Sequence, residues 1–148
     1  MNLRKVLATE SISLSLQGQT KDAVIRELVE LLTRSGHIKD QEPVLKAIFD
    51  REKKMSTGMQ NGIAIPHGKT DAVDGLVAAL GLKPVGLDFG SLDGQPSRIF
   101  VMTVSPDNRT GPHIQFLAEI SRQLNDAGVR ERLFQAQSPD EILTTLGG

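Results

Sequence analysis

The sequence predicts an α/β fold in which helices cover both faces of a mixed β-sheet. Segments with the 3.6-residue period of amphipathic helices alternate along the chain with short apolar runs typical of buried strands. The composition is globular, with 39% hydrophobic and 24% charged residues. We expect one domain over residues 1–148, because a chain of this length buries a sufficient core without disulfides or a structural metal.

The first part of the chain is expected to form one strand and two helices. Residues 11–16 alternate apolar and polar side chains, the period of a half-buried strand. Thr20 is placed to cap a helix that ends near Gly36, and Asp40 to cap a second helix that runs towards Arg51. The apolar faces of these helices are Val24, Leu28, Leu31 and Leu32 in the first, and Val44, Leu45, Ile48 and Phe49 in the second.

A polar loop over residues 53–62 precedes three apolar runs that are expected to be strands. The first, residues 63–65, should end at Pro66, which has no N–H to donate to a sheet. Residues 76–82 and 99–104 are continuous enough to be buried strands, bounded by glycine, proline and serine. The order of these strands in the sheet does not follow from the sequence.

Two further helices are expected near the C-terminus. Pro112 suits the first position of a helix. The buried face of this helix is predicted to be Ile114, Leu117, Ile120 and Leu124. Ser138 and Glu141 form a capping-box pattern that opens a last short helix extending through Leu146.

The charge and hydropathy patterns exclude several classes of protein. Seventeen basic and eighteen acidic residues leave a net charge of −1, without the basic excess of a nucleic-acid-binding surface. No apolar run approaches the length of a membrane span, and the N-terminal residues lack the apolar core of a signal peptide. We therefore expect a cytoplasmic protein that neither binds nucleic acid nor inserts into the membrane.

The missing residue types narrow the chemistry further. The chain has no cysteine, which excludes thiol catalysis and thiolate zinc sites. It also has no tryptophan or tyrosine, so aromatic stacking on a sugar or base is not expected. Histidines, carboxylates, hydroxyls and basic side chains must carry any reaction.

The densest functional motif is the segment Asn61-Gly62-Ile63-Ala64-Ile65-Pro66-His67-Gly68-Lys69-Thr70. A short strand leads to His67, Pro66 stiffens the approach and Gly68 keeps the next residue small, so the imidazole is oriented and open to another macromolecule. Taken alone, an ordinary loop histidine explains the same pattern. The end of the motif also resembles a phosphate-binding P-loop, but five residues separate its glycines where that loop needs four.

Two further side chains are candidates for binding an anion near His67. His113 falls in the first turn of a predicted helix, where unpaired N–H groups favour an anion and a neutral imidazole. Arg51 ends the second predicted helix, and a guanidinium matches the oxygens of a phosphate. A solvated side chain remains the alternative for both. His37 has no such context and is expected to be structural.

These motifs together resemble one family. They are Arg51-Glu52-Lys53, Ser56-Thr57-Gly58, Asn61 through Gly68, and Gly111-Pro112-His113. They are similar to the fructose/mannitol-type (type 2) enzyme IIA domain of the bacterial phosphoenolpyruvate-dependent sugar phosphotransferase system, a family that includes the nitrogen-regulatory enzyme IIA. The resemblance covers the whole chain and implies a three-layer sandwich with a mixed sheet of about five strands.

The resemblance implies a role for each candidate residue. His67 matches the histidine that accepts a phosphoryl group from phospho-HPr and hands it to a cysteine of enzyme IIB. His113 matches a second histidine that supports the first and helps to hold the phosphate, and Arg51 matches an arginine of the same pocket. Since the chain has no cysteine, the acceptor enzyme IIB must be a separate chain. No cofactor or metal is implied.

Three questions stay open at this point. The resemblance predicts a phosphotransferase subunit of sugar uptake, and the alternative is a regulatory enzyme IIA whose phosphorylation controls binding to partner proteins. A metal hydrolase built on His67 and His113 is the unrelated alternative, although the sequence shows no third ligand at metal-site spacing. The oligomeric state is not predicted. Gln60, Met55 and Met59 differ from the residues that are common in the family at this loop. Because the loop is expected to border the docking surface, the identity of the partner protein also stays open.

Overall fold

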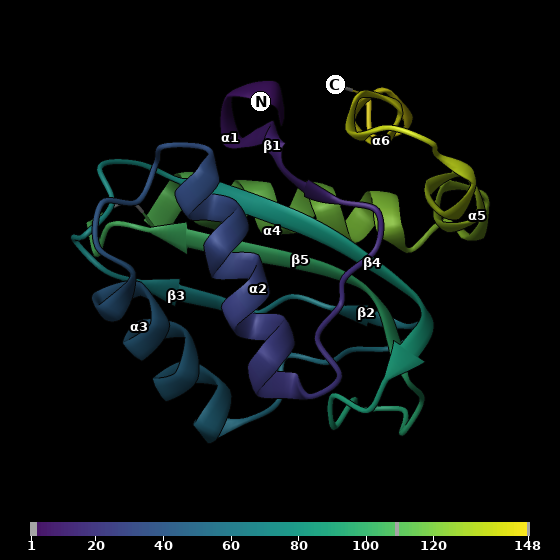
Figure 1. The fold of residues 1–148 in the computed structure, drawn as a ribbon, viewed down its shortest axis with the longest axis horizontal. Coiled ribbons are helices and arrows are strands. Elements are labelled where there is room, and N and C mark those ends of the chain that lie inside the picture. The colour runs from purple at the N-terminus through teal and green to yellow at the C-terminus, as the bar shows by residue number, and fades with distance from the viewer. Residues whose placement is uncertain (1–2, 109, 148) are drawn as a thin grey trace.

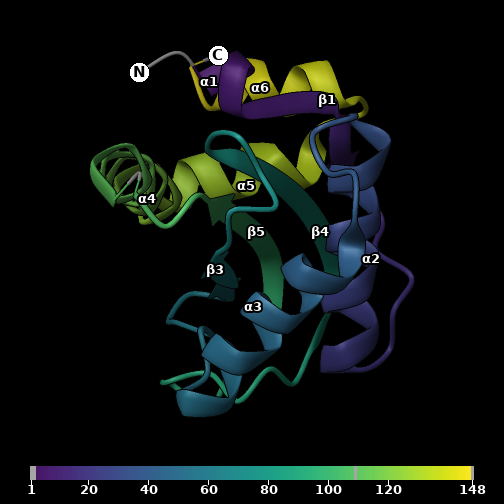
Figure 2. The same cartoon turned by 90° about the vertical axis from the view of Figure 1, so that its left-hand side faces the viewer.

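The computed structural model describes residues 3–108 and 110–147 and shows a three-layer α/β sandwich (Figure 1). One face of the sheet is covered by α2 (Lys21–Arg34) and α3 (Gln41–Lys54). The other is covered by α4 (Thr110–Leu124), α5 (Ala127–Gln135) and α6 (Pro139–Thr145), as Figure 2 shows. The predicted fold class is therefore confirmed. A one-turn helix, α1 (Leu3–Val6), precedes the first strand.

The mixed sheet has five strands in the order β1-β4-β5-β2, with β3 also paired to β5. The strands are β1 (Leu7–Ser13), β2 (Ile63–Ala64), β3 (His67–Lys69), β4 (Val77–Leu87) and β5 (Ser97–Ser105). Among the strands of the described residues, β4 pairs antiparallel with β5, whereas β1 pairs parallel with β4 and both short strands pair parallel with β5. Ile63 aligns with Ile99, and His67 aligns with Thr103. The short strands β2 and β3 therefore lie one after the other along the same side of β5.

The sheet divides the core into two apolar clusters. Along β5, Phe100 and Met102 face α2 and α3, whereas Ile99 and Val101 face α4. Alternation of this kind is what the pleat of a strand requires. Because both faces of β5 are covered, its sequence is a continuous apolar run rather than an alternating one. This is why the two central strands could be located from the sequence.

The structure corrects two of the predicted strands. The first strand spans Leu7–Ser13 instead of residues 11–16, because it packs against α2 on one side and α6 on the other and its burial does not alternate. The strand predicted over residues 63–65 does not end the pairing with β5 at Pro66. It is interrupted there, since proline has no N–H, and pairing with β5 resumes at His67.

Two corrections concern the C-terminal helices. The buried side chains of α4 are His113, Phe116, Ile120 and Leu124. Ile114 is instead 62% exposed and Leu117 only half-buried, so the predicted face was partly wrong. The prediction began the buried face at Ile114 because it counted apolar residues only. The face begins at His113, so Phe116 is buried three residues later in place of Leu117. The prediction also missed α5, whose sequence signal is an Asp126 cap.

Three of the predicted helix starts are confirmed by their capping contacts, whereas α4 begins at Thr110, two residues before the predicted start at Pro112. The side chain of Thr20 accepts the Ala23 N–H, and that of Asp40 accepts the Glu42 N–H. Ser138 accepts the Glu141 N–H at the start of α6. In the part of the chain that the structure describes, no helix has the length and apolar character needed to cross a bilayer.

Gly68 allows β3 to approach α3 closely, and this contact predicts a mutational effect. A Cβ at Gly68 would lie 3.1 Å from the Ala47 carbonyl carbon and Cβ, and 3.2 Å from the Ile48 nitrogen. Gly68→Ala is therefore expected to push β3 away from α3 and to lower the free energy of unfolding by about 1–3 kcal/mol, measured by urea denaturation. Gly75→Ala is the control, because nothing lies within 4 Å of its added Cβ. Equal stability of the two variants would contradict this account.

Candidate functional site

His67 opens β3 at the edge of the sheet with its side chain half-buried. Its Nδ1 lies 3.0 Å from the carbonyl oxygen of Ile65. A carbonyl can only accept, so Nδ1 carries the hydrogen and donates it. In the neutral ring the lone pair is then on Nε2, which makes Nε2 the nucleophilic atom of this histidine.

The structure brings His113 against His67, as an edge-on ring pair with centroids 5.8 Å apart. His113 is only 3% exposed. Its Nε2 lies 2.9 Å from the Thr103 hydroxyl, and its Nδ1 lies 2.8 Å from the Ser105 hydroxyl. A neutral imidazole is satisfied by this pair, because a hydroxyl can donate or accept. His113 thus packs edge-on against the ring of His67, while both of its own nitrogens are bonded to hydroxyls of β5.

Burial lowers the pKa of His113 from 6.5 to about 4, helped by repulsion from His67 and Lys69. The folded state therefore keeps this ring neutral where the unfolded chain takes up a proton. The resulting stabilisation is fully present above pH 6.5 and is lost as the pH falls from 6.5 towards 4.

This shift predicts that acid destabilises the wild-type chain through His113. Between pH 7 and pH 5, titration of His113 is expected to lower the free energy of unfolding by about 2 kcal/mol. Urea unfolding at the two pH values measures it, and His113→Gln should remove this share of the loss because an amide does not titrate. An identical pH dependence in the wild type and the variant would show that His113 is not the group responsible.

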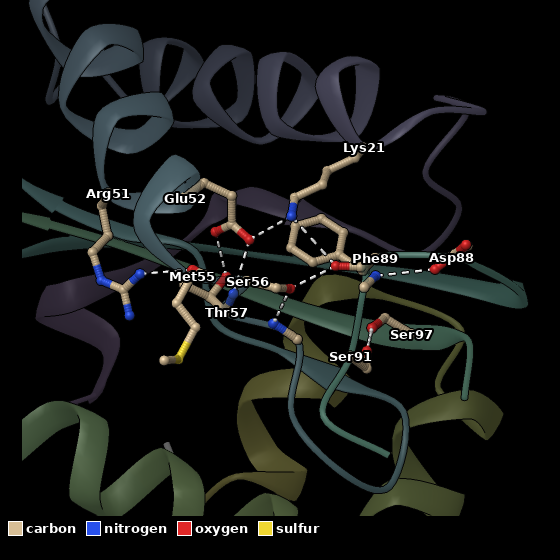
Figure 3. Close-up of polar contacts among 12 residues, drawn as sticks. Lys21, Arg51, Glu52, Met55, Ser56, Thr57, Asp88, Phe89, Ser91 and Ser97 are labelled. Atoms are coloured by element: carbon tan, nitrogen blue, oxygen red, sulfur yellow. Dashed lines mark hydrogen bonds and ion pairs between the residues drawn. The ribbon is translucent and has the colours of Figure 1, made fainter. Parts of the chain in front are cut away.

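Arg51 and His67 line the same open cleft. Their side chains therefore lie at one site, although this does not test the role predicted for either residue. Arg51 comes from the last turn of α3, and its Nη1 donates to the carbonyl oxygen of Met55 at 2.8 Å (Figure 3). A guanidinium carries five N–H donors, so this bond orients the group and leaves donors for an anion. The other lining residues are Ser56, Thr57, Gly58, Met59, Ile65, Leu92, Leu117 and Ser121.

Lys69, Thr103 and Ser105 also lie at the site and were not among the predicted site residues. Lys69 lies on the same side of β3 as His67, since side chains alternate along a strand. Its Nζ donates to the Thr110 hydroxyl at 2.6 Å, which links β3 to the start of α4. The two-residue spacing of His67 and Lys69 was a usable signal for this cation. The β5 hydroxyls gave no signal, because only the fold brings them to His113.

The structure offers no support for a metal centre at this site. Within residues 3–108 and 110–147, no three histidine or carboxylate side chains gather closely enough to hold an ion. His37 is exposed in the connection between α2 and α3 and does not line the cleft.

Comparison with known proteins identifies the family. The family model for the phosphoenolpyruvate-dependent sugar phosphotransferase system, EIIA 2, matches residues 5–147. The chain belongs to this enzyme IIA family. It is 33% identical over 145 residues to a fructose-specific EIIA component of Haloferax volcanii, with 98% of this chain and 94% of that relative covered. It is 34% identical to the fructose-specific EIIABC component of Bacillus subtilis, where 97% of this chain spans only 22% of the relative.

Solved enzyme IIA structures share the fold. The nitrogen regulatory protein IIA-Ntr of Neisseria meningitidis superposes with a TM-score of 0.91 at 27% identity, covering 99% of both chains. The mannitol enzyme IIA of Escherichia coli, solved in complex with phosphorylated enzyme IIB, superposes with a TM-score of 0.80 at 30% identity. That match covers 97% of this enzyme IIA chain and 99% of the other.

Proposed function

We propose that this enzyme IIA chain is a phosphocarrier that accepts a phosphoryl group from phospho-HPr on His67. It passes the group to a cysteine of a separate enzyme IIB, for uptake of a fructose- or mannitol-type sugar. The observation that carries the proposal is the bond from Nδ1 of His67 to the Ile65 carbonyl, which leaves Nε2 with its lone pair. The relative named for fructose supports the sugar class, and the mannitol enzyme IIA complexed with phosphorylated enzyme IIB supports enzyme IIB as the acceptor.

The proposed transfer needs no proton to move. The lone pair of His67 Nε2 forms a bond to phosphorus while the bond between phosphorus and the donor breaks, and the donor keeps that electron pair. The hydrogen on Nδ1 stays bonded to the Ile65 carbonyl, which stabilises the positive charge that the ring acquires. In the second step a cysteine thiolate attacks phosphorus, and the electron pair of the broken bond returns to Nε2.

The basic side chains of the site suit the charge of the transferred group. The oxygens of a phosphoryl group carry negative charge throughout the transfer, so fixed cations beside them stabilise the transition state. Arg51 lines the cleft with His67, and Lys69 lies on the same side of β3. In this proposal Arg51 binds the phosphoryl oxygens, and His113 keeps the His67 ring in place.

A second candidate function is regulation by phosphorylation. The TM-score of 0.91 to a nitrogen regulatory IIA-Ntr exceeds the 0.80 to the mannitol enzyme IIA. In this alternative His67 is still phosphorylated, but the product of the step is a new charge of about −1.5 to −2 beside the cleft. That charge switches binding of a partner protein on or off, instead of being passed on.

Intact-mass measurement tests the shared step and then separates the two functions. The protein is incubated with phosphoenolpyruvate, enzyme I and HPr, and we expect one added phosphoryl group that is labile in acid. Purified enzyme IIB of the fructose type is then added. Loss of the group to enzyme IIB supports the uptake proposal, whereas retention favours the regulatory one. Absence of any added group with a competent donor system contradicts both.

A further inference from the structure

A buried carboxylate lies next to the site without a part in the transfer described above. The side chain of Glu52 is only 5% exposed, and its Oε1 lies 2.8 Å from the Lys21 Nζ. Both carboxylate oxygens contact one residue of the cleft wall. Oε1 accepts the Thr57 N–H at 2.8 Å, and Oε2 accepts the Thr57 hydroxyl at 2.7 Å (Figure 3).

The contacts continue from Thr57 to the nucleophile. The carbonyl oxygen of Thr57 accepts the Ile65 N–H at 3.1 Å. The carbonyl oxygen of Ile65 in turn accepts the Nδ1–H of His67 at 3.0 Å. Glu52, Thr57, Ile65 and His67 are therefore joined by consecutive hydrogen bonds, and the last of them decides which ring nitrogen carries the hydrogen.

We propose that Glu52 is a positioning residue that sets the tautomer of His67 through Thr57 and Ile65. Glu52 is bound by Lys21 and accepts two hydrogen bonds from Thr57. Thr57 in turn accepts the Ile65 N–H, which positions the Ile65 carbonyl that accepts Nδ1–H of His67. The lone pair is thereby kept on Nε2, the atom that attacks phosphorus in the proposed transfer. This inference rests on the proposed function, because it assigns Glu52 a role in phosphoryl acceptance by His67.

The ion pair with Lys21 makes the arrangement rigid. A buried carboxylate needs a cationic partner, since removal from water otherwise disfavours its charge. Lys21 Nζ also donates to the Phe89 carbonyl at 3.3 Å and lies 4.5 Å from the Phe89 ring centroid. The Ser56 hydroxyl donates to the same carbonyl at 2.6 Å, so the cleft wall is held from two sides. Figure 3 shows these contacts converging on the loop that follows α3.

Glu27 provides a matched control for the role of Glu52. Its carboxylate also accepts two backbone N–H bonds in a loop, from Gln17 and Gly18. None of the contacts described for Glu27 leads to Thr57 or His67. Glu27→Gln should therefore disturb local backbone bonds to a similar degree without reaching the nucleophile.

The test measures the tautomer of His67 directly. Long-range ¹H–¹⁵N spectra of the imidazoles are recorded for the wild type, Glu52→Gln, Thr57→Val and Glu27→Gln. We expect the Nδ1–H tautomer in the wild type and in Glu27→Gln. Glu52→Gln removes the carboxylate charge that Lys21 and Thr57 bind, and Thr57→Val removes the hydroxyl bond to Glu52. The Ile65 carbonyl is then held less firmly, so a share of the rings should carry the hydrogen on Nε2.

Kinetics of phosphoryl acceptance from phospho-HPr provide the second readout. We expect kcat to fall about tenfold in Glu52→Gln, with KM close to that of the wild type, because misorientation affects the reacting atoms more than docking. A wild-type tautomer together with wild-type kcat would overturn the inference. Circular dichroism checks folding, and if Glu52→Gln unfolds, Thr57→Val decides, since it keeps the backbone bond to Glu52. A wild type that accepts no phosphoryl group refutes the proposed function, whereas the tautomer measurement still decides the role of Glu52.

Discussion

His67→Ala is expected to abolish phosphoryl uptake while the chain stays folded. The substitution removes Nε2, and His113 cannot replace it, because both of its ring nitrogens are bonded to hydroxyls of β5. The structural cost is small, since His67 is half-buried and its Nδ1 makes one hydrogen bond, to Ile65. Loss of that bond costs about 1 kcal/mol. Phosphoryl uptake is measured by intact mass after incubation with the donor system, and folding is measured by a thermal melt.

His37→Ala is the matched control for this prediction. It removes the exposed histidine of the α2–α3 connection, so uptake should equal that of the wild type. Undiminished uptake by His67→Ala would refute the assignment of the acceptor. Loss of uptake in both variants would show that the loss in His67→Ala is not specific to His67.

His113→Ala is expected to have the second largest effect, namely acceptance of a phosphoryl group that is then passed on poorly. The nucleophile remains, but the edge-on ring that supports His67 is gone. Deletion of a buried ring that bonds Thr103 and Ser105 also costs on the order of 3 kcal/mol of stability. The measurement is the rate of transfer from the phosphorylated variant to enzyme IIB.

His113→Gln separates the two consequences of losing this ring. An amide can donate to one β5 hydroxyl and accept from the other, so much of the stability should return. The supporting ring does not return, and transfer should stay slow. A wild-type transfer rate in His113→Ala would contradict the role proposed for His113.

The central strands and the helix caps were predictable because their causes are local. Both faces of β5 are buried, which leaves a continuous apolar run in the sequence. Thr20 caps its helix through a contact within one turn. The buried face of α4 was misassigned because His113 behaves as a core residue there, and this depends on Thr103 and Ser105, which only the folded sheet supplies.

The candidate site was predictable only in part, for a similar reason. His67 stood out in its segment, and the resemblance assigned it a role. Its proximity to Arg51 depends on the packing of β3 against α3 at Gly68, which the sequence does not show. The role proposed for Glu52 was not predictable either, since the hydrogen bonds that join it to His67 pass through the backbone carbonyls of Thr57 and Ile65.

The most direct test of the account is to locate the phosphoryl group on the phosphorylated protein, to the atom. Combined ³¹P and ¹⁵N spectra of the labelled chain identify both the residue and the ring nitrogen. We expect a bond between phosphorus and Nε2 of His67, with the hydrogen retained on Nδ1 and bonded to the Ile65 carbonyl. A phosphoryl group on Nδ1 of His67, or on any other residue, would contradict it.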